Sequence, residues 1–385
     1  MVLKELALLL LLVLALAIGW TLGRRERKQP KSYELGLRHL LNEQQDEAVE
    51  TLVEALRVDQ DNIDTHLALG GLLRRRGELE KAVFVHENVL SHARLDRRTR
   101  HEVEIELARN YLQAGLLDRA EDMSVKLALE NPQYRKDSLQ VTLQVYEQER
   151  DWLRCIETVK DMTGGLHEAR LESAISHYYC ELAEEQIARK AFDAARASVV
   201  EAIGHASNNP RTSLILGRLN LELGKTKEAI LTLERILDQD PMYVGESLPL
   251  LRRAYDEAGE SLGHYEAYLK SCIERGPSVS VVLELVGLIK TNEGALAVSR
   301  FMADHLRINP TVRGLIHLID LHLSAAEGEV SEYLQLLKDF AEALVQDKPS
   351  HRCRECGFEG KRMRWHCPSC RNWASIEPIF GLEGE

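Results

Sequence analysis

Two Cys-x-x-Cys pairs near the carboxyl end carry the clearest chemistry in the sequence. They consist of Cys353, Cys356, Cys367 and Cys370, and ten residues separate the two pairs. Each pair forms a tight turn that places two sulfurs on one side of an ion, so this spacing is typical of a four-thiolate metal site. The four cysteines are therefore the predicted metal ligands. Because four protein ligands leave no open position for water or substrate, the ion is expected to be structural.

Zinc is the expected ion and iron is the alternative, because four thiolates can hold either metal. His366 directly precedes Cys367 and could replace one cysteine, but with four thiols present it is expected outside the ligand set. Residues 351–385 also contain six Lys or Arg side chains, which would offset the thiolate charge and lower the thiol pKa values. The same basic side chains could instead contact RNA or anionic lipid.

Residues 349–385 form the predicted metal-binding ribbon. A segment of this length has little core of its own, so the metal must supply most of its folding free energy, about 10–16 kcal/mol for structural zinc. Gly357 follows the first pair and permits the positive φ that a metal-binding turn often needs. Phe358, Trp365 and Trp373 are expected to form a small apolar cluster behind the ion. The ribbon as a whole is expected to pack on the last helices of the body.

The body that precedes the ribbon is acidic and rich in helix-forming residues. The net charge of −12 divides into +3 for residues 1–30, −16 for residues 31–350 and +1 for residues 351–385. An acidic surface repels phosphate backbones, so proteins rather than nucleic acids are the expected partners. Leu, Ala, Glu and Arg are abundant and aromatic residues make up only 5%, which predicts an all-α body.

An apolar segment at the amino terminus predicts a single transmembrane helix. Leu6–Leu22 contains 17 residues without a charge, and such a helix spans about 25 Å, near the lower limit for a bilayer core. Residues 1–23 are the predicted anchor and residues 24–30 a basic cytosolic linker. Positive flanks stay in the cytoplasm, so the amino terminus is expected in the periplasm and the bulk of the chain in the cytoplasm. A cleaved secretory signal is the alternative, but its positive charge would precede the apolar run.

A pattern of small and apolar residues repeats along the body, with steps of 12, 4 and 3 residues inside each repeat. The five clearest sets are Gly36, Ala48, Leu52 and Ala55; Gly70, Ala82, His86 and Val89; Ala108, Ala120, Ser124 and Leu127; Ala183, Ala195, Val199 and Ala202; and Gly217, Ala229, Leu233 and Ile236. A small residue on one helix and Ala on the next allow two antiparallel helices to pack closely, and the later positions extend one buried face.

These spacings resemble the tetratricopeptide repeat, in which stacked helix pairs form a superhelix that holds another polypeptide. Residues 31–348 are the predicted array of about 8–9 repeats, several of them degenerate. In the weaker units the segments around Tyr146, Cys155, Tyr255, Tyr268 and Phe301 are expected to be helical without the small-residue pattern. An irregular helical domain is the alternative.

Catalytic signatures are absent from the sequence. We find no His-Glu-x-x-His motif, no phosphate-binding loop, no nucleophile elbow and no dinucleotide fingerprint. The chain is therefore expected not to be an enzyme. The three remaining cysteines, Cys155, Cys180 and Cys272, stand singly in helical sequence and are expected to be buried as small apolar side chains.

The order of these parts resembles the lipopolysaccharide assembly protein B family of Gram-negative bacteria, over the full length of the chain. The resemblance rests on Leu6–Lys28, on the repeat positions and on the four cysteines of a rubredoxin-like ribbon. It implies a non-enzymatic adaptor at the inner membrane that restrains lipopolysaccharide synthesis. The implied partners are a membrane AAA+ zinc protease, the lipid A pathway deacetylase that it degrades, and the lipopolysaccharide transport proteins or lipopolysaccharide itself.

Two other functions remain open at the level of sequence. One is a general tetratricopeptide scaffold or co-chaperone for envelope proteins, without a link to lipid A. The other is a redox or nucleic-acid-binding ribbon protein that uses the cysteine quartet.

Overall fold

The structure is a computed structural model and describes residues 63–92, 94–163, 168–259, 262–276, 278–382 and 384. The predicted anchor, the basic linker and the repeat set that begins at Gly36 lie outside these residues. Within the described ranges, no helix is both long enough and apolar enough to cross a membrane.

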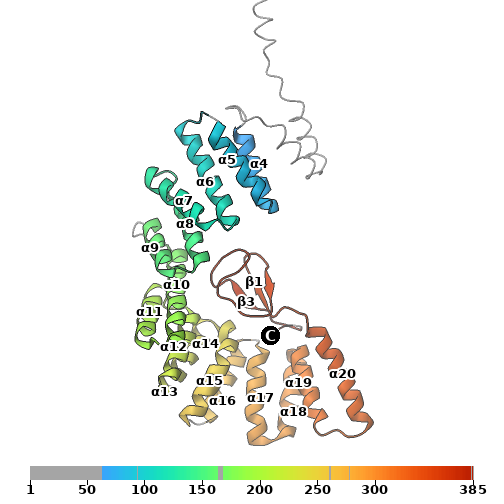
Figure 1. The fold of residues 1–385 in the computed structure, drawn as a ribbon. Helices are drawn as coiled ribbons and strands as arrows, with labels where there is room; N and C mark the ends of the chain where they lie inside the picture. Colours follow the sequence, from blue (N-terminus) through green and yellow to red (C-terminus); the bar gives the residue numbers. More distant parts are fainter. Residues whose placement is uncertain are drawn as a thin grey trace, which may run out of the picture. The chain divides into compact units, whose positions relative to one another are not determined.

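The chain divides into two compact units, Met1–Glu149 and Arg150–Glu385. The described helices of the first unit are α4 (Ile63–Arg76), α5 (Leu79–His92), α6 (Arg97–Gln113), α7 (Leu117–Glu130) and α8 (Arg135–Glu149). Each helix packs against the next one along the chain, and α6 also contacts α4 and α8 (Figure 1). Contacts between helices two apart are the stacking expected of repeated helix pairs.

The second unit contains the remaining helices and the ribbon. Its helices are α9 (Trp152–Thr163), α10 (Ala169–Ala188), α11 (Phe192–His205), α12 (Pro210–Glu222), α13 (Thr226–Glu234), α14 (Ile236–Gln239), the 3-10 helix η2 (Pro241–Tyr243), α15 (Val244–Ala258), α16 (Leu262–Arg275), α17 (Val279–Glu293), α18 (Ala295–Ile308), α19 (Val312–Leu323) and α20 (Glu329–Val345). Within this unit, α12, α15, α17 and α19 form a series in which each contacts the next. One hydrophobic core runs from α12 to α19.

A small antiparallel sheet follows α20. It consists of β1 (His351–Cys353), β2 (Glu359–Gly360) and β3 (Ile376–Pro378), with β1 in the centre. Arg352 of β1 lies opposite Glu359 of β2 on one side and Glu377 of β3 on the other. The predicted architecture, a mostly helical tetratricopeptide-type body with a carboxyl-terminal ribbon, is therefore confirmed for the described residues.

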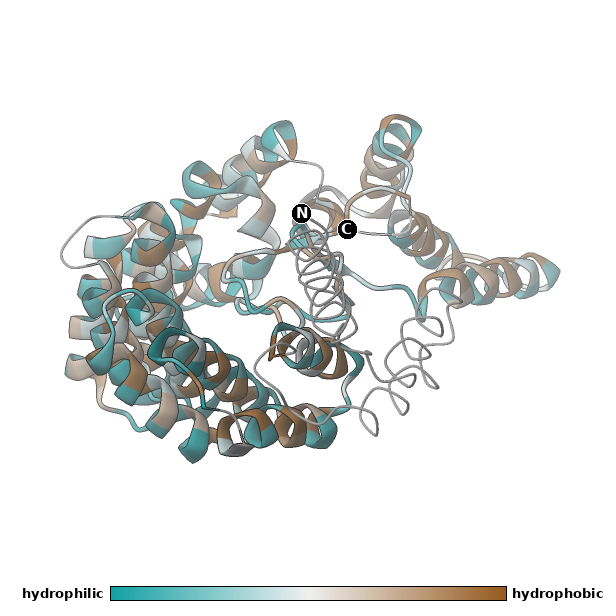
Figure 2. Cartoon of the chain, turned by 90° about the horizontal axis from the view of Figure 1, so that it is seen from above, coloured by the Kyte–Doolittle hydropathy of each residue, from teal (hydrophilic) through white to brown (hydrophobic). Residues whose placement is uncertain are grey.

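The repeat positions read from the sequence are buried. In four of the five sets every position from the second onward has an exposed fraction of at most 1%. The residues are Ala82, His86 and Val89; Ala120, Ser124 and Leu127; Ala195, Val199 and Ala202; and Ala229, Leu233 and Ile236. Figure 2 shows hydrophobic and hydrophilic residues alternating around the described helices, as expected when one face of each helix is packed.

The small residues at the first repeat position allow close helix packing. A Cβ atom added to Gly217 would lie 2.5 Å from Leu233, and one added to Gly70 would lie 2.1 Å from the His86 ring. His86 is accommodated there because Asn110 Nδ2 donates a hydrogen bond to its Nδ1 at 2.9 Å. Glycines also form turns between paired helices, where Gly77 and Gly224 have positive φ angles of 80° and 69°.

Replacement of Gly217 by Ala tests this close packing. The added methyl group would overlap Leu233, so Gly217→Ala should lower the free energy of unfolding by about 1–3 kcal/mol despite the better helix propensity of Ala. Gly287→Ala in α17 is the matched control, because no atom lies within 4 Å of the added Cβ and the change should be neutral or slightly stabilising. Urea unfolding followed by circular dichroism measures both. Equal effects of the two substitutions would contradict the packing argument.

Candidate metal centre and its contact with the helices

The structure brings the sulfurs of Cys353, Cys356, Cys367 and Cys370 within 4.8 Å of one another. Two of the separations, Cys353 Sγ to Cys370 Sγ and Cys356 Sγ to Cys367 Sγ, are 3.7 Å. A tetrahedral ion with metal–sulfur bonds of about 2.3 Å requires sulfur separations of about 3.8 Å. The donor set therefore fits a four-thiolate ion, and the four cysteines that the spacing selected lie together.

Two similar turns position the sulfurs. In the first, Gly357 N donates to Cys353 O at 2.9 Å, and in the second, Arg371 N donates to Cys367 O at 2.9 Å. The residue four positions after the first cysteine of each pair has positive φ, 75° at Gly357 and 57° at Arg371. The glycine was predicted from the sequence. The positive φ of Arg371 was not, because an arginine gives no sign that it adopts a left-handed conformation.

The four sulfurs differ in their exposure to solvent. Cys353 and Cys367 are buried, Cys370 is partly buried and Cys356 is exposed. Phe358 and Met363 pack against the two buried cysteines together with Ile376. Each pair thus contributes one sulfur to a small apolar core and one to the surface of the ribbon.

Hydrogen bonds prepare part of the cluster to bind a cation. Burial tends to raise the pKa of the Cys353 thiol, but its hydrogen bond with the Ser375 hydroxyl and those with two backbone N–H groups outweigh burial and lower the pKa to about 6. The pKa of Cys356 is also lowered, chiefly by the backbone N–H of Phe358. Burial raises the pKa of Cys370 to about 12, so this thiol depends on the metal to lose its proton.

The neighbouring cations were expected to lower these pKa values, and that expectation was wrong about the main cause. The basic side chains pair with carboxylates instead. Arg352 Nη2 lies 2.7 Å from Glu359 Oε1, and Arg354 Nη1 lies 2.9 Å from Glu377 Oε1. His366 lies outside the sulfur cluster, where its Nε2 donates to Arg371 O at 2.9 Å.

The placement of the two ribbon tryptophans also differs from the prediction. They contact the helices instead of forming a cluster behind the cysteines. Trp373 stacks on the His177 ring of α10 at a centroid distance of 5.2 Å and meets Tyr178 edge-on at 5.6 Å. Trp365 stacks on Tyr243 of η2 at 5.0 Å. These aromatic contacts attach the ribbon to the body of the second unit.

A buried arginine lies beneath both tryptophans. The guanidinium carbon of Arg211, on α12, is 5.8 Å from the centroid of each ring, which is the distance of a cation–π contact. Its side chain is only 2% exposed, and its Nη2 lies 2.7 Å from Glu181 and 3.4 Å from Glu184 of α10. A charge this deeply buried requires such partners, because its desolvation is costly.

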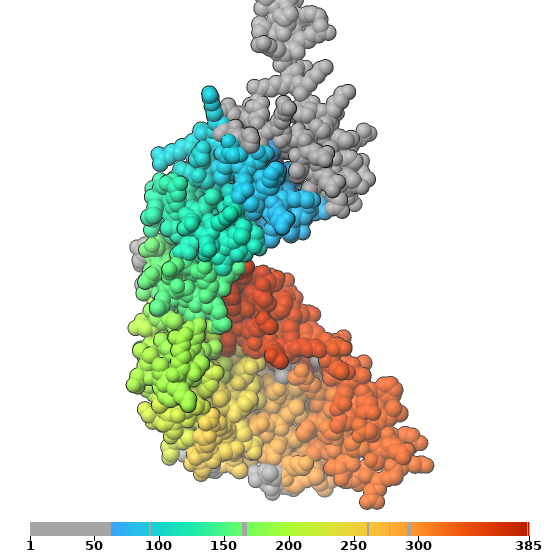
Figure 3. All heavy atoms as spheres, viewed as in Figure 1, coloured from blue at the N-terminus to red at the C-terminus, as the bar shows by residue number. Residues whose placement is uncertain are grey.

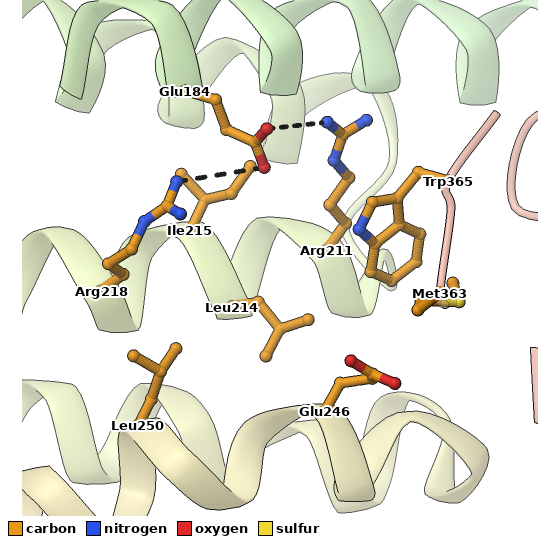
Figure 4. Close-up of a pocket in the computed structure, with 9 residues that line it drawn as sticks. All are labelled: Glu184, Arg211, Leu214, Ile215, Arg218, Glu246, Leu250, Met363 and Trp365. Carbon is orange, nitrogen blue, oxygen red and sulfur yellow. Dashed lines mark ion pairs between the residues drawn. The ribbon is translucent and has the colours of Figure 1, made fainter. Parts of the chain in front are cut away.

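A cavity of about 170 Å³ opens beside this arginine. Its lining comes from α10, α12, α15 and the ribbon, as Figure 4 shows. Glu184 bridges Arg211 and Arg218 inside the cavity. The lining residues are Glu184, Arg211, Leu214, Ile215, Arg218, Glu246, Leu250, Met363 and Trp365.

Hydrogen bonds along the rest of the ribbon complete its attachment. Arg170 Nη2 donates to Asn372 Oδ1 at 2.7 Å, and Tyr243 OH donates to Ile376 O at 3.2 Å. The expected docking on the last helices was therefore wrong in its main location. The ribbon packs chiefly on α9, α10, α12, η2 and α15, where its atoms lie against these helices in Figure 3. Its last residues reach α19, where Val312 N donates to Leu382 O at 2.8 Å.

The three isolated cysteines are buried, as predicted. Burial raises the pKa of Cys180 to about 12 and that of Cys272 to about 11. Thiols with such values remain protonated at neutral pH and are poor nucleophiles and poor metal ligands.

Comparisons with known proteins agree with these parts. Residues 351–378 match a family model described as a rubredoxin metal-binding domain, and residues 186–253 match a tetratricopeptide repeat model. A four-cysteine metal-binding ribbon is therefore present.

Two curated relatives align over nearly the whole chain. Lipopolysaccharide assembly protein B of Escherichia coli is 34% identical over 98% of this chain and 99% of its own length. The protein of the same name from Haemophilus influenzae is 27% identical over 98% of both chains. A solved tetratricopeptide repeat protein from Parabacteroides merdae covers 67% of this chain and 97% of its own, at 17% identity and a TM-score of 0.36, which is too low to support any detail.

Substitution of a buried cysteine tests the metal centre. Cys367→Ser should reduce the metal content of the purified protein from about one ion per chain to near zero, because a four-thiolate site loses most of its metal affinity when one of its four ligands is removed. Elemental analysis measures the content and identifies the metal. Tryptophan fluorescence should shift to longer wavelength as Trp365 and Trp373 leave their contacts.

Cys155→Ser is the matched control for this experiment, since Cys155 is fully buried outside the ribbon. It should retain the metal even if it lowers stability. Full metal content in Cys367→Ser would contradict the proposed ligand set.

The buried His177 predicts a pH dependence of stability. Burial, followed by the charges of Arg211 and His366, lowers its pKa to about 3. Below about pH 6.5 the unfolded state therefore binds a proton that the folded state does not, so the free energy of unfolding falls as pH decreases. Between pH 7.5 and 5.5 this residue should account for a loss of about 1.4 kcal/mol.

His177→Phe keeps an aromatic ring in the stack and should remove that loss. Urea unfolding of the two proteins at both pH values measures the difference. Equal pH dependence in the native protein and in His177→Phe would show that His177 is not kept neutral by its surroundings.

Proposed function

The chain belongs to the lipopolysaccharide assembly protein B family, and on this basis we propose that it is a non-enzymatic inner-membrane adaptor that regulates lipopolysaccharide synthesis. The observation that carries the proposal is the similarity to the Escherichia coli protein over 98% of this chain and 99% of that one, which includes the body and the ribbon together. A relationship limited to the widespread helical repeats would support only a general scaffold.

The proposed task is to promote degradation of the lipid A pathway deacetylase by a membrane AAA+ protease. In this role the helical body would hold one of the two proteins and present it to the other. The acidic body suits contacts with proteins. Lipopolysaccharide transport proteins are further candidate partners.

The ribbon would contribute by stabilising the helices on which it packs. We propose that Cys353, Cys356, Cys367 and Cys370 hold one structural ion, zinc with iron as the alternative, because four protein ligands leave no open position for water or substrate. When bound, the ion supplies folding free energy to the ribbon. The folded ribbon then places Trp365 and Trp373 against α10 and η2.

The anchor of residues 1–23 would confine this adaptor to the inner membrane, with the amino terminus in the periplasm and the body in the cytoplasm. Residues 24–30 would lie at the cytoplasmic surface as the basic linker. Tethering raises the effective concentration of the body near other membrane proteins without any new contact. The proposal therefore needs only modest affinity between the body and each partner.

Depletion of this protein in cells tests the proposal. The half-life of the deacetylase should lengthen several-fold, and expression of the native chain should restore it. Cys367→Ser should restore turnover poorly, whereas Cys155→Ser expressed at an equal level should restore it. Normal deacetylase turnover after depletion would refute the adaptor role.

Copurification separates this role from the general scaffold. A tagged full-length chain should recover both the protease and the deacetylase. Recovery of unrelated envelope proteins without these two would favour the scaffold instead.

A further inference from the structure

The last helix, α20, has an apolar face that nothing in the described part of the chain covers. Six large apolar side chains on this helix are each more than half exposed. They are Val330, Tyr333, Leu336, Leu337, Phe340 and Leu344. Scattered single apolar residues are normal on a protein surface, but six on one helix form a contiguous patch, which marks an interaction site.

The spacing of these residues identifies the patch as a stripe for another helix. Positions 330, 333, 337, 340 and 344 are separated by alternating steps of three and four residues. This is the seam spacing of paired helices, in which each side chain inserts between residues of the partner. The stripe extends over about 21 Å of the helix, or about four turns.

A neighbouring face of α20 is already used within the fold. α20 packs against α19, and Ala341 is buried. Figure 1 shows α20 at the outer edge of its unit with α19 beside it. The ribbon contacts residues that follow the helix, where Lys361 Nζ donates to Gln346 O at 3.0 Å and lies 3.1 Å from Asp347 Oδ1. The stripe is therefore a separate surface from the cavity beside Arg211.

An exposed apolar stripe at this position is unusual for a repeat array. Terminal helices of such arrays normally present a polar outer face, because no further repeat follows to cover them. Here the terminal helix of the body presents the kind of face that an internal helix buries. We infer that something outside the described chain covers it.

The charges on α20 indicate which kind of molecule can bind the apolar stripe. The exposed acidic residues of α20 are Glu329, Glu332, Asp339 and Glu342. The single cation of the helix, Lys338, is 22% exposed and lies 2.7 Å from Asp320. The surface around the stripe is therefore negative, which repels an anionic lipid headgroup and attracts basic side chains.

The same charges disfavour a second copy of this chain. α20 carries four exposed carboxylates and one lysine that is already paired with Asp320, so two copies of the helix side by side would bring two negative surfaces together. Like-charged surfaces oppose association. A partner helix that carries Lys or Arg beside its apolar stripe would gain from the charges that repel a second copy.

We propose that α20 is a docking surface for an amphipathic helix of a partner protein, whose apolar stripe is flanked by Lys or Arg. The interaction uses the seam from Val330 to Leu344 for apolar contact, and the negative charge of α20, to which Glu332 and Asp339 contribute, attracts the basic side chains of the partner. It does not depend on the identity of the partners in the proposed adaptor role, and it adds a binding surface distant in sequence from the tetratricopeptide match at 186–253.

Site-specific photocrosslinking in cells tests this proposal. The full-length chain carries p-benzoylphenylalanine in place of Leu336, at the edge of the stripe, and mass spectrometry maps the segment it captures. We expect a protein segment with apolar residues at helical three-and-four spacing and with flanking Lys or Arg. The matched control places the same photoreactive residue at Leu129 of α7, which is 76% exposed but isolated, and it should not capture that segment.

Two variants test whether the crosslinking depends on the apolar stripe and on the acidic residues of α20. Phe340→Ser should reduce the yield roughly tenfold, as expected for loss of a central apolar contact. Glu332→Lys together with Asp339→Lys should also reduce it. Unchanged circular dichroism and metal content show that the fold is intact. Capture of a second copy of the chain, of lipid or of a segment without basic residues would overturn the proposal, as would the absence of any crosslinked protein.

Discussion

The burial of Arg211 between the helices and the ribbon is the interaction on which the second unit depends. A guanidinium that is 2% exposed must regain the energy of its lost hydration. Glu181 and Glu184 supply part of it through ion pairs, and Trp365 and Trp373 supply part through their ring faces. The carboxylates belong to the helical body and the rings to the ribbon. Neither part alone completes the environment of this charge, so the ribbon and the helices stabilise each other.

The sequence predicts most of what is local in this fold. The small residues at fixed steps identified helix pairs, because close packing at Gly217 admits no larger side chain. The cysteine spacing predicted that the four sulfurs cluster, because a tight turn brings two sulfurs together within four residues. The positive φ of Gly357 was also predicted, because few other residues adopt this backbone conformation.

The contacts that attach the ribbon could not be predicted in this way. Arg170 and Asn372 lie 202 positions apart, and no periodicity connects them. Arg211 follows Asn209 and Pro210, which form an ordinary helix start, so its sequence context indicates a cap and not a buried charge. The two tryptophans were expected in a cluster behind the ion and instead contact the helices, because the type of a side chain does not specify which surface it contacts. In the degenerate repeats the small-residue rule also ends, and stacked tyrosines such as Tyr255 and Tyr265, 4.6 Å apart, fill the space between helices.

The position of the ribbon at the end of the chain has a consequence for synthesis. Helices α9 to α15 leave the ribosome long before Trp365 and Trp373 exist, so the site around Arg211 and His177 must wait for the last residues to be translated. Closing a loop of this length is slow compared with forming local helix pairs. The nascent chain therefore passes through a stage in which the helices are present while an aromatic and charged surface is still open to water. A messenger RNA truncated shortly before codon 350 would yield a protein without the ribbon, in which this surface remains exposed to water.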